Sequence, residues 1–328
     1  MKRLSVFCLL ISFFFFSFAQ KDTLKSGEKN PSLIRENPDS IVHHRIGWKN
    51  TGLAGINFSQ SSYTNWASGG QNSISGTALF NLLSVYKNGG RITFENKIDF
   101  SYGRTQIGPE NRKSDDKIDV STKYGRTIGE SKWLYTVQTN FKSQFDRGYN
   151  YPNDSVFTSR FLTPGYFVYA LGLDYKPNDD FSLFISPLSG KTTIVNDQPL
   201  ADAGAFGVEK AVLDTAGNVI TPGKRYRSEF GGSLTLGYTR ELSKSIKFST
   251  TLKLFSNYLQ NPGNVDVNWE TLLSFKVNKF ISATIATELI YDDDILVPVD
   301  KDNDGVKESS GPRLQFKEVL SLGFSYKF

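Results

Sequence analysis

Apolar and polar residues alternate with a period of two along most of the chain after residue 48. In the stretch 91–103, Ile92 and Phe94 fall on one face while Thr93 falls on the other, among charged and hydroxyl residues. This period predicts β-strands with one apolar and one polar face. Twelve segments follow it, at about 49–59, 72–86, 91–104, 117–127, 132–145, 165–176, 181–190, 228–242, 245–258, 264–277, 280–291 and 313–328.

The connections between these segments alternate in length. The short ones carry turn residues and lie at 88–90, 128–130, 177–179, 243–244 and 278–279. The others are mostly much longer, at 60–71, 105–116, 146–164, 191–227, 259–263 and 292–312. A soluble β-sandwich has no reason to sort its loops by length. We therefore predict an all-β fold, a transmembrane antiparallel up-and-down β-barrel of about twelve strands with short periplasmic turns and long outer loops.

Both ends of the chain favour export to the outer membrane. Met1-Lys2-Arg3, an apolar run over 4–16 and Ser17-Phe18-Ala19 resemble a signal peptide over 1–19 that is cleaved after Ala19. Residues 20–47 lack any period and are expected to form a flexible periplasmic arm before the barrel at 48–328. The final strand ends on Phe328, the aromatic end that the barrel-assembly machinery recognises during biogenesis.

The composition fits a barrel in outer-membrane lipid. A mean hydropathy of −0.34 and 38% hydrophobic residues are too low for membrane helices but suit strands with only one face in lipid. The single cysteine, Cys8, leaves with the signal, so a disulfide, a thiol nucleophile and a cysteine-ligated metal are excluded. The mature net charge of about +3, from 36 cations and 33 anions, is too small to indicate a nucleic-acid partner.

The polar faces of the predicted strands would line the lumen with charge. Twelve cations and six anions fall there. The candidate lumen residues include Arg91, Glu95, Lys97, Asp99, Lys142, Lys247, Lys253 and Glu270. Two interpretations follow: a narrow solute or ion pore with a weak anion preference, or a barrel filled by a salt-bridge network. A filled barrel would suit an accessory subunit of a larger outer-membrane assembly or transport complex.

An enzyme is not expected. The two histidines, His43 and His44, lie in the arm, so no histidine-assisted site is available on the barrel. Two adjacent histidines without a third ligand at suitable spacing are also weak evidence for a metal site. A lipid-modifying enzyme therefore stands only as a remote alternative, and no catalytic residue is assigned.

One loop has the spacing of a calcium ligand set. Asp300, Asp302 and Asp304 alternate before Gly305, as at the start of an EF-hand loop. Glu308 falls at position nine, but a glycine stands at position twelve, where the bidentate glutamate belongs. The alternatives are a structural calcium site that stiffens the loop and a solvated acidic loop. No other cofactor is expected.

The first long loop, 60–72, is uncharged and contains one large aromatic residue, Trp66, followed by Gly69 and Gly70. The glycine pair permits a tight reversal. The loop would either fold into the lumen and narrow it, or present a contact surface to an envelope partner.

Parts of the sequence also resemble a known family. The stretches Trp48-Lys49-Asn50, Asn57 to Ser62 and Asn65-Trp66-Ala67-Ser68-Gly69-Gly70-Gln71-Asn72 are similar to a Bacteroidota outer-membrane barrel family, domain of unknown function 3078. Tyr291-Asp292-Asp293-Asp294-Ile295 and the final strand are similar to it as well. The resemblance implies the fold and the location, and it supplies no activity and no catalytic residues.

Overall fold

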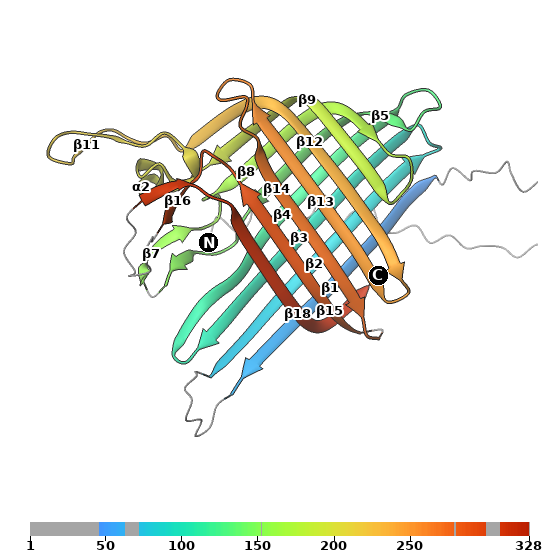
Figure 1. Ribbon diagram of the computed structural model, residues 1–328, viewed down its shortest axis with the longest axis horizontal. Coiled ribbons are helices and arrows are strands. Elements are labelled where there is room, and N and C mark those ends of the chain that lie inside the picture. The colour runs from blue at the N-terminus through green and yellow to red at the C-terminus, as the bar shows by residue number, and fades with distance from the viewer. Residues whose placement is uncertain (1–45, 63–71, 152, 279, 300–308, 328) are drawn as a thin grey trace, which may run out of the picture. The chain divides into compact units, whose positions relative to one another are not determined.

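The computed structural model describes residues 46–62, 72–151, 153–278, 280–299 and 309–327. Twelve antiparallel strands form a closed barrel in the order β1-β18-β15-β14-β13-β12-β9-β8-β5-β4-β3-β2 (Figure 1). These strands are β1 (Gly47–Ser61), β2 (Ser73–Asn88), β3 (Ile92–Ile107), β4 (Glu110–Thr127), β5 (Trp133–Ser143), β8 (Gly165–Tyr175), β9 (Phe181–Ile194), β12 (Tyr226–Ser243), β13 (Ile246–Asn257), β14 (Asp266–Lys276), β15 (Ile281–Tyr291) and β18 (Gln315–Lys327).

The ring confirms the predicted fold class, and each predicted segment overlaps one barrel strand. The prediction of a long loop over 105–116 is wrong. There β3 runs to Ile107 and β4 starts at Glu110, around Gly108 with a φ of 56°. This part of the hairpin is rich in polar residues, which weakens the alternation. Polar contacts still join the two strands, since Arg104 Nε donates a hydrogen bond to Asn111 Oδ1 at 2.9 Å.

The alternation places apolar side chains on the outside of the barrel. Tyr135, Trp269 and Leu322 are 61%, 46% and 61% exposed on the outward faces of β5, β14 and β18. Charged side chains occupy the inward faces, where they pair with one another. This arrangement is the reverse of a soluble domain, which buries its apolar residues.

The ladders between neighbouring strands differ in length at one place. β2 and β4 each pair with β3 over sixteen residue pairs, and the other ladders have ten or more, except one. Among the described residues, β1 pairs with β18 over only five, from Leu53↔Lys327 to Asn57↔Gly323. We call this boundary the seam. Away from the C-terminal end of β18, the two strands run in different directions (Figure 1).

The long connections contain structure of their own. The additional elements are β6 (Gly148–Asn150), β7 (Asn153–Ser159), α2 (Gln198–Asp202), η1 (Ala205–Gly207), β10 (Val212–Leu213), β11 (Val219–Thr221), β16 (Leu296–Val299) and β17 (Ser309–Pro312). Val195, Ala201 of α2 and Val208 form a small buried core, against which Leu200 and Phe206 pack. Within the described ranges, no helix has the length and hydrophobicity needed to cross a membrane.

Candidate functional site

Charged side chains from both sides of the barrel meet at the middle of its interior. Lys97 and Asp99 lie on β3, Lys117 and Asp119 on β4, Lys142 on β5, Lys253 on β13, Glu270 on β14 and Glu288 on β15. We call these eight residues the central belt. The alternation of each strand turns them inward, because their neighbours in sequence occupy the outward face, which is mostly apolar.

Two ion pairs of the central belt join opposite walls. Lys117 Nζ lies 3.3 Å from Glu270 Oε1, and β4 and β14 are six places apart in the ring of twelve strands. Lys142 Nζ lies 2.8 Å from Glu288 Oε1, and β5 and β15 are also six places apart. A bond between strands so placed has to cross the interior. The barrel is therefore narrow at this level, and side chains span it.

Other contacts tie the central belt into one network. Lys253 Nζ lies 3.8 Å from Asp119 Oδ2, and Lys97 Nζ lies 2.9 Å from Asp99 Oδ2 on its own strand. Asn140 Nδ2 donates to Asp119 Oδ1 at 2.6 Å. The belt contains four cations and four anions, so its formal net charge is zero. Each charge thus has a partner in a partly desolvated space, where a lone charge would be costly.

A second group of charges fills the interior near the short turns. Lys123 Nζ lies 3.2 Å from Asp174 Oδ2, Lys176 Nζ lies 3.6 Å from the same oxygen, and Lys176 also pairs with Glu95. We call these four residues the turn-side cluster. The cavity among them measures about 10 Å³, about the space of a single water molecule.

A third group surrounds Lys191 near the long loops. Its Nζ lies 2.6 Å from Asp266 Oδ2, 3.0 Å from Asp292 Oδ2 and 3.8 Å from Glu229 Oε2. Arg227 extends the group, since Nη2 lies 3.0 Å from Glu229 Oε2. We call these five residues the loop-side cluster.

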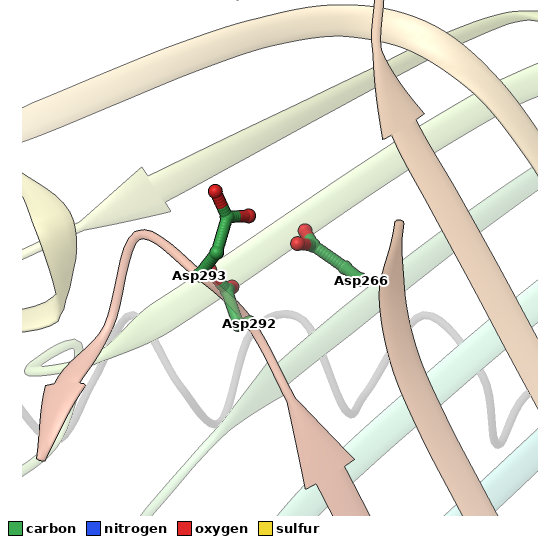
Figure 2. A group of neighbouring side chains, drawn as sticks. All are labelled: Asp266, Asp292 and Asp293. Atoms are coloured by element: carbon green, nitrogen blue, oxygen red, sulfur yellow. The ribbon is translucent and has the colours of Figure 1, made fainter. Parts of the chain in front are cut away.

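Three carboxylates at this end have the spacing of a metal-ligand set. Ligand oxygens of Asp266, Asp292 and Asp293 lie within 4.8 Å of one another (Figure 2). The Lys191 ammonium already pairs with two of them, and Asn264 Nδ2 donates to the third. Protein groups thus balance this acidic group, which gives no independent sign of a metal.

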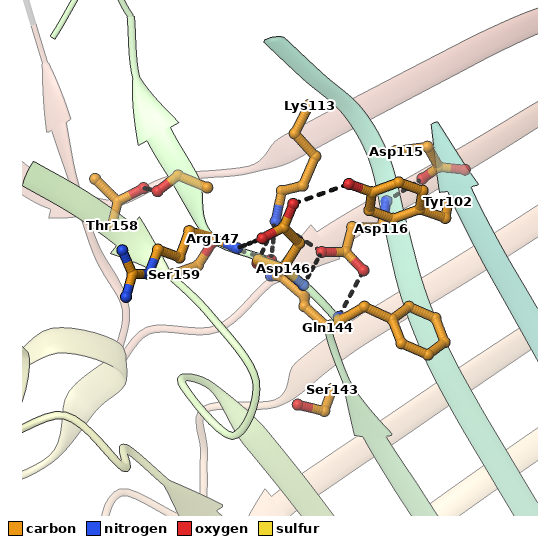
Figure 3. A network of polar contacts seen from close by, with 12 residues as sticks. Tyr102, Lys113, Asp115, Asp116, Ser143, Gln144, Asp146, Arg147, Thr158 and Ser159 are labelled. Carbon is orange, nitrogen blue, oxygen red and sulfur yellow. Dashed lines mark hydrogen bonds and ion pairs between the residues drawn. The ribbon is translucent and has the colours of Figure 1, made fainter. Parts of the chain in front are cut away.

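A polar network anchors the segment that follows β5. The two carboxylate oxygens of Asp116 accept the backbone N–H groups of Phe145 at 2.7 Å and Asp146 at 2.9 Å (Figure 3). Lys113 Nζ donates to Asp116 at 2.9 Å, and Tyr102 Oη donates to Asp146 at 2.8 Å. These bonds hold the start of the long connection against β3 and β4.

The candidate lumen residues from the sequence fall into four places. Lys97, Asp99, Lys142, Lys253 and Glu270 belong to the central belt, and Glu95 to the turn-side cluster. Arg91 lies in the turn before β3, and Lys247 is exposed near the start of β13.

The remaining candidates lie outside the described residues. They are the calcium ligands Asp300, Asp302, Asp304 and Glu308, the loop residues Trp66, Gly69 and Gly70, and the histidines His43 and His44. The signal peptide over 1–19 and nearly all of the arm also lie outside them, so these expectations stay predictions.

Alternation did not indicate that Lys191 and Arg227 lie on barrel strands, because both fall in the predicted long link 191–227. They belong to β9 and β12, which reach further than the alternation indicates. The run Asp292 to Asp294 is visible in the sequence, but nothing there indicates that Lys191 would meet Asp292.

Comparisons with known proteins give one family match and several solved structures, and they supply no role. Residues 58–149 match the model of a family described as protein of unknown function (DUF3078). A search of the curated proteins finds no match.

Solved structures of similar fold include an outer membrane channel from Pseudomonas putida F1, at 12% identity and a TM-score of 0.38, covering 89% of this chain and 100% of that chain. The translocator domain of the autotransporter NalP from Neisseria meningitidis has 11% identity, a TM-score of 0.32 and coverage of 89% and 92%. The NanC porin has 11% identity, a TM-score of 0.34 and coverage of 85% and 100%.

Proposed function

We propose that this chain is a non-enzymatic outer-membrane protein whose barrel is filled rather than open. The apolar outward faces and the charged inward faces suit a barrel in lipid. The short links at one end and the mostly longer connections at the other suit the same environment.

The crossing ion pairs carry the proposal of a filled lumen. Lys117–Glu270 and Lys142–Glu288 join opposite walls, with the turn-side cluster and the loop-side cluster toward the two ends. A solute would have to separate these pairs in order to pass. Because the central belt is neutral, its paired charges also give no basis for anion preference.

A filled barrel offers no passage to solutes, so its function depends on contacts made by its outer surface. We therefore favour a role as a membrane-embedded subunit of an envelope assembly over a role as a general pore. The anchored connection after β5 and the small core that α2 and η1 help to form give the loop end a defined surface for a partner to contact. A narrow pore is the competing function, and it requires the central belt to open.

Single-channel recording in a planar bilayer tests the proposal. The refolded full chain should give no stable conductance steps. The double variant Glu270→Ala with Glu288→Ala removes both crossing pairs, and it should give steps with anion preference because the lysines of the belt then outnumber its acids. Glu241→Ala, an exposed residue near the turn between β12 and β13, serves as the control and should stay silent. Stable steps from the unaltered chain would overturn the proposal.

A further inference from the structure

The seam leaves part of the barrel wall without backbone pairing. β18 pairs with β15 from Gln315 to Phe324, but among the described residues it pairs with β1 only from Gly323 onward. Within the described part of the chain, the β1-facing edge of β18 over Gln315–Leu322 therefore has no counterpart to the ladders of the other barrel strands. We call it the free edge.

Side-chain exposure is high all along the outward face of β18. Leu320 is 76% exposed and Leu322 is 61% exposed, but Phe324, which pairs with both β1 and β15, is also 67% exposed. The missing backbone pairing with β1 within the described ranges, and not exposure, therefore marks the free edge.

In lipid such an edge is costly. About half of the backbone N–H and C=O groups along a strand point to each side, and each group left unsatisfied in hydrocarbon costs several kcal/mol. An acyl chain cannot donate or accept these bonds, whereas an added β-strand satisfies the whole row. The chemistry of the edge therefore selects a polypeptide as its occupant.

A carboxylate lies on the outward face at the same edge. Cross-strand pairing aligns Thr250 with Thr271, Thr271 with Thr287, and Thr287 with Glu318. Their neighbours Glu270, Glu288 and Lys317 form ion pairs in the interior, so this polar row faces outward and ends on Glu318, which is exposed. A charge on the lipid face is unfavourable unless a partner group meets it.

We propose that the seam is a docking site for one β-strand of a partner polypeptide. The strand adds antiparallel to β18 along Gln315–Leu322, directs apolar residues to lipid, and places a basic side chain beside Glu318. The proposal rests on the membrane location proposed above and identifies the surface through which this barrel joins an assembly.

Disulfide trapping tests whether the seam is open. Ile56 and Phe324 are directly paired, and Phe58 and Leu322 are the next outward-facing positions in the same register. In Cys8→Ser full-length protein in lipid nanodiscs, Ile56→Cys with Phe324→Cys should oxidise readily, because paired strands lie within disulfide reach. Phe58→Cys with Leu322→Cys should oxidise at least about tenfold more slowly. Equal oxidation rates for the two cysteine pairs would show that β1 and β18 stay paired beyond Gly323, and this result would overturn the proposal.

Disulfide capture of a synthetic peptide tests whether a β-strand can occupy the free edge. The probe is a synthetic peptide with the sequence of β15, which already pairs antiparallel with β18 on its other side. It carries Thr287→Lys, opposite Glu318, and Ala283→Cys, opposite Leu322. The barrel carries Leu322→Cys or, as the control, Leu252→Cys on the doubly paired β13.

Capture at Leu322→Cys should exceed capture at Leu252→Cys at least about tenfold, a difference of 1.4 kcal/mol in binding. A scrambled peptide should lose this preference. Glu318→Gln in the barrel should weaken capture of the lysine peptide about threefold, as expected for an exposed ion pair, and leave the threonine form unchanged.

One combined result would contradict the strand proposal: equal peptide capture at the two positions together with slow oxidation of the cysteines at 58 and 322. It would mean that lipid or the chain itself covers the free edge. Conductance by the unaltered barrel would overturn the filled lumen and leave both of these measurements intact. The two proposals can therefore fail separately.

Discussion

The central belt and the seam are two regions of one barrel that close in different ways. In the belt, side chains from strands six places apart meet across the interior, as Lys142 does with Glu288. At the seam, β1 and β18 are neighbours in the ring, and among the described residues they pair over only five positions. Side chains thus block the interior at the central belt, where a pore would be open. Along part of the seam, the described strands lack the backbone pairing that would make the wall continuous.

One ion pair indicates how the two regions are related. Lys317 Nζ on β18 lies 2.8 Å from Asp115 Oδ1 on β4, although three strands stand between them on the shorter way around the ring. The inner face of β18 therefore approaches β4 at the level where its edge no longer pairs with β1. Inward attraction between side chains and loss of backbone pairing occur together at this level.

The largest loss of stability is expected at the short ladder between β1 and β18. A Cβ at Gly323 would lie 2.6 Å from the backbone oxygen of Ile56, so Gly323→Ala should push β18 off β1 at the short ladder. We expect a loss of about 1–3 kcal/mol in the free energy of unfolding, the usual cost of overpacking. Urea unfolding from lipid vesicles measures it.

Gly237→Ala is the matched control. Gly237 lies within β12, and a Cβ there would meet nothing within 4 Å. Its unfolding free energy should change much less than that of Gly323→Ala. Equal changes for the two variants would mean that the short ladder does not close the ring.

A smaller effect is expected in the central belt. Lys142→Met keeps most of the side-chain volume and removes the cation between Glu288 and Glu270. About a quarter of the Lys142 side chain is exposed. The loss in the free energy of unfolding should therefore be smaller than the roughly 3–5 kcal/mol expected for breaking a fully buried ion pair. We expect about 1–2 kcal/mol, measured by urea unfolding.

The comparison for this variant is Lys97→Met. Lys97 pairs with Asp99 on its own strand and is 49% exposed, so its removal should cost under about 1 kcal/mol. A larger loss at Lys97 than at Lys142 would contradict the idea that the crossing pairs hold the walls together.

The period-two pattern predicted all twelve barrel strands because the outward row of each strand is mostly apolar. It failed over 105–116, where both faces of the β3–β4 hairpin are polar and alternation carries no signal. The small hairpins in the long connections were missed for a related reason, since β10, β11, β16 and β17 are only two to four residues long.

The partners of the interior charges could not be predicted. Alternation indicates that Lys117 and Glu270 face inward, but their contact depends on which strands stand opposite each other and on the width of the barrel at that height. The seam was equally hidden, because β1 and β18 alternate like any fully paired strand. The residue pattern indicates which side chains of a strand face inward. Which of these side chains meet depends on how the ring of strands closes.

Amide hydrogen exchange of the barrel in lipid tests the central claim, that the wall is incomplete along the seam. Amides of β18 over Gln315–Leu322 should alternate, with every second one protected by β15 and those between exchanging at least about 100-fold faster. Amides of β14 over Val267–Phe275, which is paired on both sides, should all exchange slowly. Uniform protection along β18 would contradict the account.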